Sequence, residues 1–123
     1  MGKFVIKTTA TGFTFHLKAG NGQTIATSEV YSSESACQKG IESVKVNAPV
    51  AALEDQTVEG YQEAKHPKFQ LYTDKKGEVR FRLTAKNGQT IAVSEGYTTH
   101  SAAMNGVESV RKNAPDAEVK KED

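Results

Sequence analysis

Residues 15–49 read FHLKAGNGQTIATSEVYSSESACQKGIESVKVNAP, and residues 81–115 read FRLTAKNGQTIAVSEGYTTHSAAMNGVESVRKNAP. Both stretches contain the run NGQTIA, then a Ser-Glu pair, a tyrosine and a closing Asn-Ala-Pro. Matching residues stand 66 positions apart, as Asn21 and Asn87 do. Self-similarity at a fixed spacing outranks other sequence signals in deciding an architecture. The chain is therefore a tandem duplication.

The duplication divides the 123 residues into a first repeat (residues 1–57), a polar connector (residues 58–67) and a second repeat (residues 68–123). A segment of about 55 residues buries too little surface to be comfortably stable alone. We therefore expect the two repeats to share one core and to form one compact domain.

Each repeat begins with three stretches of alternating apolar and polar residues, which predict strands. In the first repeat Phe4 and Ile6 share one face, as do Phe13, Phe15 and Leu17 in the next stretch. Asn-Gly follows in both copies and predicts a tight hairpin of type I′, in which both central residues take positive φ. Each repeat is thus expected to start as an antiparallel meander of three strands.

The apolar period then lengthens to that of a helix. Ser32-Ser33 and Thr98-Thr99 supply hydroxyls suited to a helix start, and the residue before each closing proline is pushed out of helical geometry. A glycine inside a helix costs about 1 kcal/mol relative to alanine. Its recurrence at Gly40 and Gly106 on the apolar face predicts a close approach of helix to sheet.

The order of these features resembles the bacterial YegP-like family over nearly the whole chain. The motifs that carry the resemblance are the meander, NGQTIA, Ser-Glu-x-Tyr, a helix with Gly-[Ile/Val]-Glu-Ser-Val, and Asn-Ala-Pro. The resemblance implies two β-β-β-α-β units joined in one sheet with exchanged C-terminal strands. Residues 53–57 would then lie alongside copy two, and residues 118–121 alongside copy one. The family has no established biochemical activity, so the resemblance implies no catalytic residue.

These expectations define an α+β fold. It consists of two tandem repeats that form one antiparallel sheet, with both helices on one face and a pseudo-twofold axis between the copies.

The histidines, the single cysteine and the carboxylates are the residues from which a catalytic or metal-binding motif could be built. His16 aligns with Arg82, His66 lies in the connector and His100 aligns with Glu34, so no histidine is repeated. Cys37 aligns with Ala103, and no zinc, calcium, phosphate-loop or dinucleotide motif is found. Catalysis needs convergent groups that no motif here supplies. We therefore expect a protein that is not an enzyme and needs no metal or cofactor.

The repeated polar residues allow two interpretations. Asn-Gly is explained by a turn, whereas Ser28-Glu29 with Tyr31, and Ser94-Glu95 with Tyr97, precede the helices. An aromatic there can anchor the loop and a carboxylate can complement the helix dipole. The alternative is a paired binding site at the pseudo-twofold axis.

The sheet face opposite the helices carries a second candidate site. Its expected residues are Lys3, Lys7, Thr14, His16 and Lys18 in copy one, and Lys68, Tyr72, Arg80, Arg82 and Thr84 in copy two. Basic residues interleaved with an aromatic can bind single-stranded nucleic acid or another polyanion. We select Lys18, Tyr72, Arg80 and Arg82 as this candidate binding face. The formal net charge of +1 favours an ordinary solvated face instead.

The sequence therefore predicts a small, soluble, cytoplasmic protein that acts as a binding or interaction module of unknown role. One cysteine fits a reducing compartment, and no stretch reaches the roughly 20 apolar residues of a membrane span. We expect a monomer with internal symmetry and a protein partner. A polyanion or nucleic acid is the alternative partner.

Overall fold

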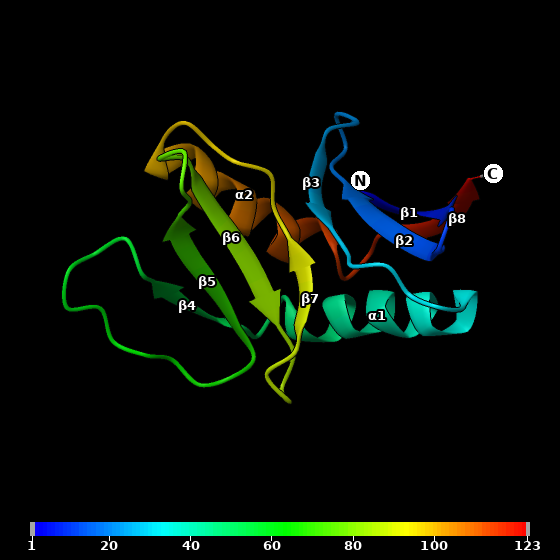
Figure 1. The fold of residues 1–123 in the computed structure, drawn as a ribbon, viewed down its shortest axis with the longest axis horizontal. Coiled ribbons are helices and arrows are strands. Elements are labelled where there is room, and N and C mark those ends of the chain that lie inside the picture. The colour runs from blue at the N-terminus through cyan, green and yellow to red at the C-terminus, as the bar shows by residue number, and fades with distance from the viewer. Residues whose placement is uncertain (1, 123) are drawn as a thin grey trace.

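The computed structural model describes residues 2–122, and both copies fold with the same order of elements (Figure 1). Copy one contains β1 (Lys3–Thr9), β2 (Gly12–Lys18), β3 (Thr24–Thr27), α1 (Glu34–Asn47) and β4 (Ala52–Asp55). Copy two contains β5 (Lys68–Thr73), β6 (Val79–Thr84), β7 (Thr90–Val93), α2 (His100–Asn113) and β8 (Glu118–Glu122). The β-β-β-α-β order expected for each repeat is confirmed.

The eight strands form one sheet in the order β4-β5-β6-β7-β3-β2-β1-β8. The last strand of each copy pairs with the first strand of the other, with Leu53 opposite Phe69 and Val119 opposite Phe4. The strand exchange implied by the family resemblance is thus confirmed. Both exchanged strands pair in parallel with their neighbours. Parallel neighbours need a long crossover, and between β4 and β5 residues 56–67 supply it. The sheet is therefore mixed, with antiparallel pairing in its six inner strands.

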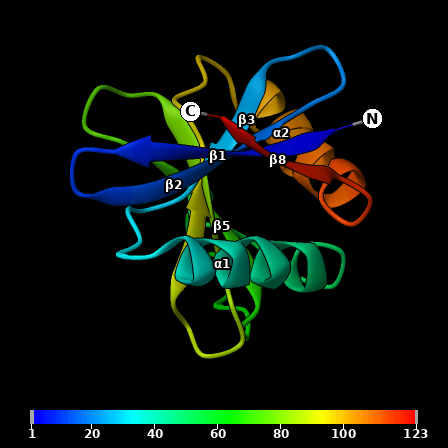
Figure 2. The same cartoon turned by 90° about the vertical axis from the view of Figure 1, so that its right-hand side faces the viewer.

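The two copies meet in the sheet where β3 faces β7. Thr27 opposite Val93 is the one pairing between these strands in the described part of the chain. The sheet twists strongly there: β1, β2 and β8 run across the view in Figure 2, while β5 runs roughly perpendicular to them. A junction held by so short a pairing leaves the rest of both strands without a neighbour on that side.

Each helix lies across both copies. Helix α1 packs against β2 and β7, and α2 packs against β6 and β3, so both helices cover the same sheet face. The side chain of Ser33 accepts a hydrogen bond from the Ala36 N–H, and Thr99 does the same for Ala102. These are the capping hydroxyls that the sequence predicted at the helix starts.

The glycines inside the helices lie against tyrosines. A Cβ atom at Gly106 would lie 2.5 Å from the hydroxyl oxygen of Tyr97 and 2.8 Å from Cε2 of Phe81. A Cβ atom at Gly40 would meet Tyr31 in the same way. The expected close approach of helix to sheet is confirmed, and its cause is a tyrosine ring inserted between them.

The Asn-Gly hairpins form, but type I′ is the wrong turn. Only the glycine takes positive φ, at 88° for Gly22 and 85° for Gly88. The Gly22 N–H donates to the Ala19 carbonyl and the Ala19 N–H donates to the Gln23 carbonyl, each at 2.9 Å. This pattern is typical of a three-residue loop, in which a type I turn is followed by a left-handed glycine. Asn21 instead uses its side chain, which accepts the Gln23 N–H at 3.0 Å.

One hydrophobic core joins the two copies beneath the helices. It includes Phe4 and Phe15 from copy one, in edge-to-face contact with ring centroids 5.6 Å apart. Phe69 and Phe81 make the matching contact in copy two at 6.0 Å. The shared core expected from the small size of each repeat is therefore present. Within the described residues, neither helix has the length and apolar character needed to span a bilayer.

Candidate functional site

The repeated serines before the helices have structural roles. Ser28 is buried, and its hydroxyl accepts the Phe15 N–H at 2.9 Å while donating to the Glu29 carbonyl at 2.7 Å. Ser94 makes the equivalent bonds with Phe81 and Glu95. In both copies the hydroxyl continues the sheet hydrogen bonding where the strand ends. The recurrence of these serines is therefore explained without a ligand.

The repeated tyrosines anchor the same loops. Tyr31 forms an isolated antiparallel bridge with Phe13 and stacks on Phe15 at 6.2 Å. Tyr97 does the same with Val79 and Phe81. Burial raises the pKa of both phenols above the ordinary value, with Glu29 and Glu95 adding to the rise in their own copies. Both side chains therefore stay neutral near pH 7.

Two clefts flank the single pairing between β3 and β7. The register that places Thr27 opposite Val93 would, if continued, place Ile25 opposite Glu95 and Ile91 opposite Glu29. The strands separate instead, and a cavity lies on each side. The first cleft, of about 280 Å³, is lined by Gln23, Thr24, Ile25, Glu95, Gly96 and Tyr97. The second cleft, of about 340 Å³, is lined by Glu29, Tyr31, Gln89, Thr90 and Ile91.

The two clefts are built from equivalent residues of opposite copies. Each takes Gln-Thr-Ile from the start of the third strand of one copy, and a glutamate and a tyrosine from the loop before the helix of the other. Glu29 and Glu95 are exposed, whereas Ile25 and Ile91 are each only 7% exposed. The lining contains no lysine, arginine or histidine. Each cleft therefore presents a negative charge with amide and hydroxyl groups beside it.

The sequence missed these clefts because their halves lie far apart along the chain. The sequence pattern predicts a hairpin strand at Gln23 and Thr24, and a complement to a helix dipole at Glu95. The one available signal was that the glutamine, threonine, isoleucine, glutamate and tyrosine of the linings recur in both copies. The structure brings those recurrent residues together in pairs at the pseudo-twofold axis, which is where the alternative interpretation placed a binding site.

A larger hollow, of about 560 Å³, lies between α1 and β8. Its lining is Ser35, Gln38, Lys39, Ile41, Glu42 and Val119. Gln38 is exposed, whereas Met104, its counterpart in copy two, packs against the core. Lys39 likewise differs from its counterpart Asn105, so the lining of the hollow recurs only in part.

Three of the four residues selected for the basic face lie together. Tyr72 of β5 is paired with Arg80 of β6, and the Arg82 guanidinium lies 4.6 Å from the centroid of the Tyr72 ring. Lys18 lies on β2, which β7 and β3 separate from this group. The arginines also have partners: Arg80 Nε donates to Asp74 at 2.7 Å, and Arg82 Nε donates to the Gln70 side chain. The hydrogen bond from Arg80 lowers the pKa of Asp74.

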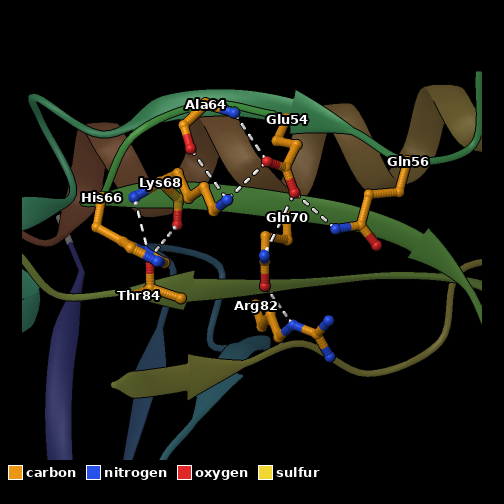
Figure 3. A network of polar contacts seen from close by, with 8 residues as sticks. All are labelled: Glu54, Gln56, Ala64, His66, Lys68, Gln70, Arg82 and Thr84. Atoms are coloured by element: carbon orange, nitrogen blue, oxygen red, sulfur yellow. Dashed lines mark hydrogen bonds and ion pairs between the residues drawn. The ribbon is translucent and has the colours of Figure 1, made fainter. Parts of the chain in front are cut away.

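Lys68, which the sequence placed on the same open face, is buried. Its ammonium group donates to Glu54 at 2.7 Å and to the Ala64 carbonyl at 3.0 Å. Figure 3 shows the Glu54 carboxylate enclosed by Lys68, Gln56, Gln70 and the Ala64 N–H. Burial would raise the pKa of Glu54, but these hydrogen bonds and the Lys68 charge outweigh burial and lower it to about 2. The connector thus folds over this part of the face, and Lys68 cannot contact a polyanion.

Each histidine has a polar neighbour in a strand. His66 Nδ1 lies 2.7 Å from the Thr84 hydroxyl, His100 Nε2 lies 2.8 Å from Asp55, and His16 Nδ1 lies 3.2 Å from the Thr27 hydroxyl. These contacts are far apart in the sheet. No group of three His, Cys, Asp or Glu side chains within residues 2–122 could hold a metal ion.

Comparison with known proteins identifies the repeat. The model of the family described as "Domain of unknown function (DUF1508)" matches residues 9–55 and again residues 74–120. The chain belongs to this family. Both matches run from the first hairpin of a copy into its exchanged strand, so each DUF1508 unit supplies half of each cleft.

DUF1508 relatives occur with two repeats and at shorter length. A UPF0339 protein of Bordetella pertussis is 43% identical over 119 residues, covering 97% of this chain and 94% of its own. A UPF0339 protein of Treponema denticola is 56% identical over 52 residues, covering 42% of this chain but 90% of its own. The solution NMR structure of yegP from E. coli, a protein of unknown function, superposes with a TM-score of 0.80. It is 34% identical, with 98% of this chain and 91% of that one covered.

The YegP-like resemblance is thereby confirmed. These relatives are uncharacterised, so they assign no activity to the DUF1508 fold.

Proposed function

We propose that this protein is a non-enzymatic binding module whose ligand occupies the first and second clefts. One observation carries the proposal: recurrent residues from opposite copies converge twice at the pseudo-twofold axis. Ser28 and Ser94 are explained by the loops they hold. Thr24, Thr90, Glu29 and Glu95 have no such explanation in the contacts described above, and a shared ligand supplies one.

The chemistry of the clefts supports binding rather than catalysis. Each lining has one carboxylate, and neither lining has a histidine, cysteine or lysine that could act with it as acid, base or nucleophile. The phenols of Tyr31 and Tyr97 are turned toward Gly40 and Gly106 and are kept neutral. An active site needs such groups to converge on one reacting atom. We further propose that the protein acts as a cytoplasmic monomer, in keeping with its free, buried Cys37.

The test is a pull-down from native cell extract with the full chain as bait. Glu29→Lys/Glu95→Lys reverses the charge of both clefts at exposed positions, and Glu59→Lys/Glu63→Lys makes the same change in the connector as a control. We expect the bound component to be lost from the cleft variant and kept by the control. Equal capture by both variants would overturn the proposal.

A polyanion is the second candidate ligand, favoured by the Arg82 guanidinium stacked over Tyr72 beside Arg80. Base stacking on an aromatic next to cations is a general mode of binding single-stranded nucleic acid. The partners of both arginines weaken this candidate. Arg80→Ala/Arg82→Ala in the same pull-down, with and without nuclease, tests it. Nuclease-sensitive material lost from this variant and kept by the cleft variant would favour the polyanion.

A further inference from the structure

We propose that each cleft accepts an extended peptide segment, which adds a strand to the free edge of β3 or β7 and places a lysine or arginine side chain beside Glu95 or Glu29. This inference rests on the proposed function and names the ligand class of the same clefts. It is carried by the strand register, by the opposite wall of each cleft and by the charge of the lining.

The strand register leaves free edges inside the clefts. Strand β3 pairs with β2 on one side, and on the other side it meets β7 only at Thr27. Strand β7 likewise pairs with β6 on one side and meets β3 only at Val93. Backbone groups of an antiparallel strand point alternately to its two sides. A β-bulge interrupts this alternation within residues 24–26 and 90–92. The N–H and C=O groups there that do not pair with β2 or β6 face the clefts, where an added strand can pair with them.

The opposite wall of each cleft is also extended backbone held from behind. In the first cleft the Ser94 N–H donates to the Phe81 carbonyl, and Tyr97 exchanges two hydrogen bonds with Val79. In the second cleft Ser28 and Tyr31 make the equivalent bonds with Phe15 and Phe13. Neither wall has to unfold or give up a bond to admit a ligand. Such preorganisation lowers the entropic cost of binding.

The charge of the clefts selects the side chain. Glu95 and Glu29 are the charged residues of the two linings, and both are exposed. A basic side chain there meets its opposite charge, whereas an acidic one meets like charge, which disfavours binding. Volumes of about 280 and 340 Å³ fall at the small end of ligand sites. They suit a short stretch of chain, not a folded domain.

The experiment uses a phage-displayed library of random nine-residue peptides selected against the full chain. We expect enrichment of peptides that contain lysine or arginine. In synthetic form these should shift backbone amide NMR signals of residues 23–26, 29–31, 89–92 and 94–97. Methylating alternate backbone nitrogens of the best peptide should lower its affinity for the protein at least about tenfold. This is the equivalent of one lost hydrogen bond to a buried partner. Glu29→Lys/Glu95→Lys should weaken the unmethylated peptide similarly, and Glu59→Lys/Glu63→Lys should leave it unchanged.

Three results would overturn the inference. They are an absence of enriched peptides, amide shifts confined to other residues, and a methylated peptide that binds as well as its parent. Spermidine serves as a second probe because it carries cationic groups without a peptide backbone. If spermidine shifts the cleft amides and no peptide does, the peptide inference fails while the proposed function stands. If extract capture ignores the cleft variants as well, both fail.

Discussion

At the scale of single residues, the glycines in the helices show how a sequence anomaly records a contact. Gly40 and Gly106 sit mid-helix, where alanine is favoured by about 1 kcal/mol. The structure places a tyrosine hydroxyl and a phenylalanine ring edge where a Cβ atom would lie. The tyrosine stacks at 6.2 Å on that phenylalanine, so neither ring can withdraw freely.

We therefore predict that Gly106→Ala destabilises the protein although it improves helix propensity. Overpacking a filled core costs roughly 1–3 kcal/mol, which exceeds the propensity gain. Urea unfolding followed by circular dichroism measures the change, and the exposed Asn105→Ala in the same helix is the matched control. Tyr97→Phe removes the hydroxyl oxygen closest to the new Cβ atom. The double variant Gly106→Ala/Tyr97→Phe should therefore recover part of the free energy of unfolding that Gly106→Ala loses. A Gly106→Ala protein as stable as Asn105→Ala would show that the ring is not fixed.

Residue patterns predicted these local features because each depends on neighbours in sequence or on the repeat. The capping hydroxyls of Ser33 and Thr99 and the close approach at Gly40 were all read correctly. The turn type was not, because Asn21 satisfies its loop through a side-chain bond to Gln23 that a φ preference does not encode. The clefts were not predicted at all, since they depend on where the register between β3 and β7 stops.

At the scale of elements, β4 is attached through a contact that the sequence did not predict. Its Glu54 and the first residue of β5, Lys68, form an ion pair with side chains 1% and 4% exposed. The equivalent positions in β8 and β1 are Lys120 and Lys3, so copy one has no matching pair. Periodicity could place Lys68 only on the face away from the core. The connector covers Lys68 through tertiary contacts. Copy one has no matching contacts, so the repeat gave no signal for them.

The ion pair between Glu54 and Lys68 makes the free energy of unfolding depend on pH in the acid range. The folded-state pKa of Glu54 is about 2, below its ordinary 4.5, so its stabilisation is complete above pH 4.5 and is lost as pH falls toward 2. Glu54→Gln/Lys68→Met removes both charges together and avoids leaving one buried alone, which costs about 3–5 kcal/mol. Urea unfolding at pH 6 and at pH 2.5 measures the free energy of unfolding. Between these two pH values the parent should lose more of it than the double variant does, by more than about 1 kcal/mol. Glu108→Gln, at an exposed position, is the control and should show the same dependence of stability on pH as the parent. Equal losses in the parent and the double variant would place the acid-sensitive group elsewhere.

At the scale of the whole molecule, strand exchange makes each repeat depend on the other. Strand β4 has its partner in copy two, β8 has its partner in copy one, and each helix packs on both halves. The Treponema denticola relative aligns over 52 residues, slightly less than one repeat, so a chain of that length must satisfy the same edges. Pairing two copies of the repeat is the arrangement that the pseudo-twofold axis already describes.

We therefore predict that residues 1–57 alone dimerise, or unfold on dilution, and that residues 68–123 dimerise more weakly. In a dimer of the first fragment Glu54 would lie beside Lys3, which occupies the place of Lys68, so opposite charges meet. In a dimer of the second fragment Lys120 would lie beside Lys68, and like charges on neighbouring strands are destabilising. Sedimentation with circular dichroism across a range of concentrations measures both, and Lys120→Glu should strengthen the second dimer. A folded monomer of residues 1–57 would contradict the shared sheet. If the two fragments dimerise equally well, the charge at the position of Glu54 and Lys120 does not decide which strand pairs with β1 or β5.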